Sequence, residues 1–150
     1  MNLLAFHSDH LTIISKHLDP CSRVMLKLTC KRMNAIIVIR RPYERMIDSA
    51  ARYGHLEVLK WMRQSQVKWS AYACEIAACN GHLHILRYLR SEGCLWDTFT
   101  CLYAASNGHL EVLKWARENG CHWNSWTCKN ARSNGHLEVY NWARENGCPE

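Results

Sequence analysis

Apolar residues recur at helical spacing in short segments of the chain, and glycines with polar neighbours separate these segments. In one segment, Leu110, Leu113 and Ala116 fall three residues apart, as on one face of an α-helix. Glu111 lies near the start of that segment and Arg117 near its end, where each charge offsets the helix dipole. The pattern predicts an amphipathic helix of about nine residues.

The same pattern returns every 27 residues, marked each time by a Gly-His pair. Before each pair, a polar residue suited to an N-cap opens a second helical segment, and Asn-Gly is expected to close it with a left-handed C-cap. Helices this short are marginal alone in water and need neighbouring units to bury their apolar sides. The sequence therefore predicts an all-α, helix-turn-helix solenoid over residues 40–150. Its units are 40–66, 67–93, 94–120 and 121–147, and the N-cap candidates are Ser70, Asp97 and Asn124.

These units resemble ankyrin repeats. The stretch "AASNGHLEVLKWARENG" resembles the ankyrin core, with paired alanines in the first helix, Gly-His at the turn and an aliphatic second helix. Two features depart from the family: its period is about 33 residues, and "YACE", "FTCL" and "WTCK" replace its threonine-proline-leucine-histidine motif. Short units with Trp and Cys at these places look like the ankyrin arrays of large DNA viruses of amoebae.

The first helices differ most from unit to unit, at positions three and four residues apart that share a helix face. The resemblance implies that this concave side binds protein partners. We interpret the face as a recognition surface, and an ordinary solvated face is the alternative. Its residues are Tyr72, Glu75 and Ile76, then Phe99, Leu102 and Tyr103, then Trp126, Lys129 and Asn130.

The repeated cysteines and histidines are expected to be structural. Cys74, Cys101 and Cys128 occupy the place of a family leucine, and buried cysteine behaves as a small hydrophobe. Equivalent residues of a solenoid lie a full repeat apart, which argues against a shared zinc ion. A Cys-His nucleophile stays open, although no third orienting residue recurs with the pair. We expect no metal, no cofactor and no enzymatic activity, because no phosphate-binding loop, nucleophile elbow or carboxylate pair is present.

Two series of tryptophans recur with the units, near the start of each unit and on its second helix. We interpret both as packing between repeats, with a base-stacking platform as the rival. That rival requires arginine-rich exposed surfaces, whereas residues 46–150 carry only +1 of the net charge of +6.

Residues 1–39 do not follow the repeat. Two amphipathic helical segments flank "LDPCS", where proline interrupts the helix. The stretch "FHSDHLTIISKHLDPCSRVMLKLTCKRMN" resembles an F-box, although Phe6 and His7 replace the usual Leu-Pro and Met33 replaces a tryptophan. The resemblance implies that this module binds the Skp adaptor of a cullin ubiquitin ligase through Leu11, Ile14, Leu18, Pro20, Leu26 and Leu28.

The N-terminal third is also compatible with two simpler roles. The segment could simply cap the first repeat, as every solenoid requires. Its basic cluster could instead bind nucleic acid, although charge alone supports only weak, salt-sensitive attachment and such clusters more commonly form a solvated helix surface. The cluster comprises Lys27, Lys31, Arg32, Arg40, Arg41 and Arg45. We expect no nucleic-acid partner.

The apolar segments and the cysteines indicate the compartment in which the protein works. The longest apolar run, "AIIVI", is far shorter than the roughly 20 residues that cross a bilayer, and the first residues lack the features of a secretory signal. We therefore expect a cytoplasmic protein with reduced thiols and no membrane partner. The sequence predicts an adaptor that joins a ligase to a target held on the repeats, and the alternative is a binding scaffold or competitor that recruits no ligase.

Overall fold

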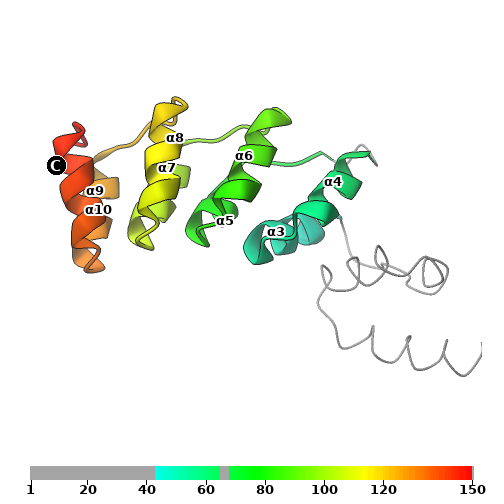
Figure 1. The fold of residues 1–150 in the computed structure, drawn as a ribbon, viewed down its shortest axis with the longest axis horizontal. Helices are drawn as coiled ribbons and strands as arrows, with labels where there is room; N and C mark the ends of the chain where they lie inside the picture. The colour runs from blue at the N-terminus through cyan, green and yellow to red at the C-terminus, as the bar shows by residue number, and fades with distance from the viewer. Residues whose placement is uncertain (1–42, 65–67, 150) are drawn as a thin grey trace, which may run out of the picture.

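The computed structural model describes residues 43–64 and 68–149, and within these residues every regular element is an α-helix. The helices stand as pairs in a single row, from α3 and α4 to α9 and α10 (Figure 1). From α4 onward, equivalent helices begin 27 residues apart, as the period predicts. The helices are α3 (Tyr43–Tyr53), α4 (Leu56–Gln64), α5 (Ala71–Cys79), α6 (Leu83–Ser91), α7 (Thr98–Ser106), α8 (Leu110–Glu118), α9 (Ser125–Ser133) and α10 (Leu137–Glu145). The all-α solenoid is confirmed, and the residues predicted to bind the adaptor, from Leu11 to Leu28, lie outside the described residues.

The predicted N-caps hold for two helices of the three. A side-chain oxygen of Asp97 accepts a hydrogen bond from the backbone N–H of Phe99 at 2.9 Å, and Asn124 does the same for Trp126 at 3.0 Å. These bonds satisfy donors that a first helical turn leaves unpaired. Ser70 stands at the same position of α5, but its side chain makes no capping bond.

Asn-Gly pairs close the first helices α5, α7 and α9, as expected. The Asn107 side-chain amide donates to the carbonyl of Tyr103 at 2.9 Å, and Gly108 follows with a φ of 77°. Only glycine adopts that left-handed conformation without strain. The chain then reverses into the second helix of the unit.

The histidines that follow Gly81, Gly108 and Gly135 pack on the preceding unit. A Cβ atom added to Gly108 would lie 2.7 Å from Nδ1 of His136, and one added to Gly81 would lie 2.8 Å from the His109 ring. The Nε2 atom of His109 also hydrogen-bonds the carbonyl of Cys79, in the unit before, at 3.0 Å. The histidines are therefore structural, and they join neighbouring units rather than only forming their own turn.

The core lies between the two rows of helices and is built from small residues on the first helices and aliphatic ones on the second. Cys74, Cys101 and Cys128 are each at most 1% exposed, which confirms the prediction that they belong to the core. The first helices α3, α5, α7 and α9 pack directly on one another, whereas the second helices touch each other only sparsely.

A second series of cysteines, which the sequence analysis did not single out, ties each unit to the one before. Cys94, Cys121 and Cys148 are buried at the entry to successive units. The Cys121 thiol donates to the carbonyl of Asp97 at 3.2 Å, and the Cys94 thiol donates to that of Ser70 at 3.3 Å. The N-cap carbonyl of one unit thereby holds the first residue of the next.

The tryptophans pack between units, as predicted, and also within each unit. Trp96 and Trp115, from the same unit, meet edge to face with centroids 5.7 Å apart. The guanidinium of Arg90, from the preceding unit, lies 4.1 Å from the centroid of Trp96, and Arg117 lies at the same distance from Trp123. The ring pairs therefore form within a unit, and the arginines make the contact between units. Because cations cover these rings, the packing interpretation is favoured over base stacking.

Candidate protein-binding face

Three large aromatic side chains stand exposed at equivalent positions of successive first helices. Tyr72 and Phe99 are each 50% exposed and Trp126 is 60% exposed. Each is the second residue of its helix, in α5, α7 and α9 respectively. We call these three residues the aromatic row.

Capping bonds hold the backbone of two residues of this row in place. Asp97 and Asn124 accept their hydrogen bonds from the backbone N–H groups of Phe99 and Trp126 themselves. The residue that opens the helix therefore also fixes the backbone from which the aromatic ring projects. These rings are therefore attached to ordered helix residues rather than to loops.

Neighbours on the same helix restrict the rings further. Phe99 stacks on Tyr103, one turn later in α7, with centroids 6.1 Å apart and planes inclined by 27°. In α9, the ammonium of Lys129 lies 5.7 Å from the centroid of Trp126, a cation–π contact. These contacts reduce the side-chain entropy that the row would lose on binding a partner.

The accessible part of this face is narrower than the sequence predicted. Ile76 is only 5% exposed and packs in the hydrophobic core, so its assignment to the accessible face is wrong. An aliphatic side chain at this point gains more from the core than from water. Tyr103 and Asn130, at the equivalent positions of the next units, are half-buried, as are Glu75 and Leu102. Lys129 is exposed.

The charge beside the aromatic row changes sign along the array. Glu75 lies three residues after Tyr72, and Lys129 lies three residues after Trp126. Partial burial raises the pKa of the Glu75 carboxyl above its usual value, and the negative charge of Asp97 raises it further. The α5 end of the row is thus acidic and the α9 end is basic.

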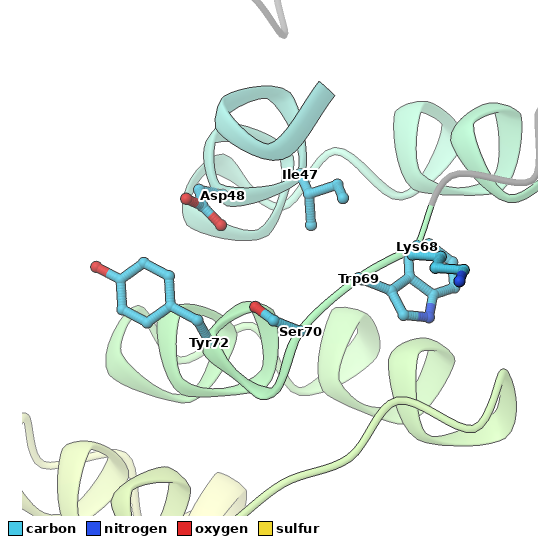
Figure 2. A pocket seen from close by; sticks show the side chains of 6 residues that line it. All are labelled: Ile47, Asp48, Lys68, Trp69, Ser70 and Tyr72. Carbon is cyan, nitrogen blue, oxygen red and sulfur yellow. The ribbon is translucent and has the colours of Figure 1, made fainter. Parts of the chain in front are cut away.

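A hollow of about 460 Å³ continues the face between α3 and α5 (Figure 2). Ile47 and Trp69 supply apolar surface, and Lys68 and Asp48 bring opposite charges to its lining. Figure 2 shows the Tyr72 ring on the same side of the hollow as the Asp48 carboxylate. Tyr72 therefore lines the hollow and also belongs to the aromatic row.

The Cys74 and Cys101 thiols are poorly suited to nucleophilic chemistry. A hydrogen bond with the Cys94 thiol raises the pKa of Cys74, and burial raises it further. The pKa of Cys101 is raised in the same way by Cys121 and by burial. Because the thiolate is the reactive form, these groups stay protonated and act as core atoms.

Over residues 43–64 and 68–149, no group of three or more His, Cys, Asp or Glu side chains is arranged to hold a metal ion. In the same residues, no helix is both long and apolar enough to traverse a bilayer. Within the described chain, the exposed aromatic row and its hollow are therefore the surface features that we take as the candidate site.

Comparison with known families agrees with this arrangement. A model of ankyrin repeats, in three copies, matches residues 46–127. A model of the F-box domain matches residues 3–45. No curated protein matches the chain. Both families are typically non-enzymatic interaction modules, and their combination supports the role of a protein-interaction adaptor.

Proposed function

The chain belongs to the ankyrin-repeat family, and we propose that it acts as an adaptor between a ubiquitin ligase and a target protein. In this proposal, the N-terminal segment binds the Skp adaptor of a cullin ligase, and the aromatic row with its flanking charges holds the target. No catalysis is required of the chain itself, because the ligase transfers ubiquitin.

The observation that carries the target-binding half is the aromatic row itself. Large apolar rings that remain half-exposed on adjacent helices leave surface that a partner can remove from water, and contiguous exposed apolar surface marks interaction sites. Aromatic residues also dominate the energetics of protein interfaces. The equivalent position on α8 and α10, in contrast, holds the glutamates Glu111 and Glu138.

The ligase half rests on residues 3–45. The F-box match covers Leu11, Leu18 and the other apolar residues that the sequence analysis assigned to adaptor binding. The short units resemble the ankyrin arrays of large DNA viruses, and this likeness suggests where the protein works. In that setting, the protein works in the host cytoplasm and recruits the host's ligase.

The ligase half is tested by capture of the full chain on purified Skp adaptor. We expect the wild-type chain to be retained, and Leu11→Asp and Leu18→Asp to lose retention, because each places a charge on the apolar face that docks. Ser15→Asp adds the same charge to the same segment outside that set and is the matched control. Circular dichroism of each variant checks that the repeats remain folded.

Two results would reject this half of the proposal. The first is that the adaptor does not retain the wild-type chain, and the second is that Leu11→Asp and Leu18→Asp bind as the control does. Either result leaves the alternative function, a binding scaffold or competitor whose N-terminal helices only cap the repeats.

A further inference from the structure

The spacing of the aromatic row follows from the residues beneath it. Where α5 packs on α7, buried alanines and cysteines such as Ala73, Cys74 and Cys101 line the first helices. Packed helix axes lie about 8–10 Å apart, and small side chains favour the lower part of that range. Because Tyr72, Phe99 and Trp126 occupy the same position of successive helices, their side chains are expected to project at steps of about 8–10 Å.

A partner segment that uses all three rings needs side chains on one face at the same step. In a β-strand, residues three apart lie about 10 Å from each other but point to opposite faces. In an α-helix, the nearest same-face match is seven residues and about 10.5 Å. In a polyproline II helix, three residues complete one turn and rise about 9.3 Å, so every third side chain meets the next ring.

The chemistry of the rings favours the same conformation. A polyproline II backbone makes no internal hydrogen bonds, so its carbonyls remain acceptors. The Tyr72 hydroxyl and the Trp126 indole N–H are donors at the two ends of the row, and the structure pairs neither group with another described residue. An α-helical partner would offer no such carbonyls except at its end. Flat aromatic surfaces also suit proline rings, as in the aromatic grooves that bind proline-rich segments.

The charges at the two ends of the aromatic row favour one orientation of the bound partner segment. The carboxylate of Glu75 lies beside the Tyr72 end of the row and the ammonium of Lys129 lies beside the Trp126 end. A partner with a basic residue at the first end and an acidic residue at the second complements both. The reverse order places like charges together at each end.

We propose that the target is held through a proline-rich segment in polyproline II conformation, with apolar residues three apart over about seven residues and with a basic residue at the α5 end. The proposal rests on the target-binding half of the proposed function and specifies the chemistry of the target.

The test is selection from displayed peptide libraries on the immobilised full chain. One library fixes prolines three residues apart, a second fixes them four apart, and a third is alanine-rich with leucines seven apart to form helices. All remaining positions are randomised. The best peptide is then labelled, and its Kd is measured by fluorescence anisotropy.

We expect enrichment only from the library with prolines three apart. Phe99→Ala removes the central ring and should raise the Kd of the selected peptide about tenfold, the order of loss for one aromatic contact. Leu137→Ala is the matched control, because it truncates a side chain that is 60% exposed on a second helix. It should leave the Kd unchanged. The exchange Glu75→Lys with Lys129→Glu should invert the charge order of the selected peptides.

Several outcomes would overturn the inference. They are enrichment of the helical or the four-spaced library, the absence of any enrichment, and a Kd that does not respond to Phe99→Ala. Helical peptides that depend on Phe99 would keep the proposed target face and reject the polyproline II conformation. Capture by the Skp adaptor is measured separately, so failure of the ligase half does not affect this result.

Discussion

The contact between each glycine and the next histidine leads to a quantitative prediction. Gly108 and Gly120 both have left-handed backbones, with φ of 77° and 83°. An alanine at either site pays about 1–2 kcal/mol for that conformation. At Gly120 the added Cβ meets no atom within 4 Å, whereas at Gly108 it meets His136 at 2.7 Å. Gly108→Ala should therefore lower the free energy of unfolding by a further ~1–3 kcal/mol, the cost typical of overpacking.

Urea denaturation followed by circular dichroism measures both variants on the full chain. Gly120→Ala measures the cost of the backbone alone, so the difference between the two variants reports the clash. In a double-mutant cycle, His136→Ala should recover most of that difference, because it removes the atoms that the new Cβ meets. Equal losses for the two glycine variants, or no recovery with His136→Ala, would refute our account of the Gly-His pair.

Single contacts support three more predictions. Thr100→Val should stabilise the fold by about 1 kcal/mol in thermal denaturation, because the Thr100 hydroxyl is buried without a hydrogen-bond partner among the described residues; a loss of stability would contradict this. Arg117→Ala should lower the free energy of unfolding by about 1–2 kcal/mol, since it removes a cation–π contact and a hydrogen bond between units. The control Lys114→Ala breaks only an exposed ion pair and should lower it by less than about 0.5 kcal/mol. Equal losses for the two variants in urea denaturation would argue against the arginine contact. Burial and Asp97 raise the pKa of Glu75, so the folded state holds its proton more tightly than the unfolded state, and stability should fall as pH rises from the unfolded to the folded pKa. Glu75→Gln should remove that part of the pH dependence, and an unchanged profile would count against it.

The contacts between units explain why the period is so regular. A repeat of this kind is stabilised by its neighbours as much as by its own helices. Here the Gly81–His109 contact, the Cys121 thiol on the carbonyl of Asp97 and the arginine over Trp123 all join one unit to the next. The Gly–His and arginine–tryptophan contacts require a particular residue in each of the two units, so these residues return at the same positions.

Local physical chemistry made much of the fold predictable from sequence. Asp97 and Asn124 cap the helices they precede, and glycine follows asparagine where a left-handed turn is required, because these effects act within a few residues of the chain. The burial of Cys101 and its equivalents also followed from the repeat, since a position that faces the core in one unit faces it in the next.

Contacts across 20 to 30 residues were decided only by the tertiary structure. Periodicity assigned Ile76 to the same face as Tyr72, yet the packing of α5 buries Ile76 and leaves the tyrosine half-exposed. No spacing along the chain reveals that Cys94 would bond a carbonyl 24 residues earlier or that His109 would bond one 30 residues earlier. Sequence determined which residues form each helix, because those interactions are local. The structure decided which side chains remain available to a partner, because that depends on how closely neighbouring helices approach.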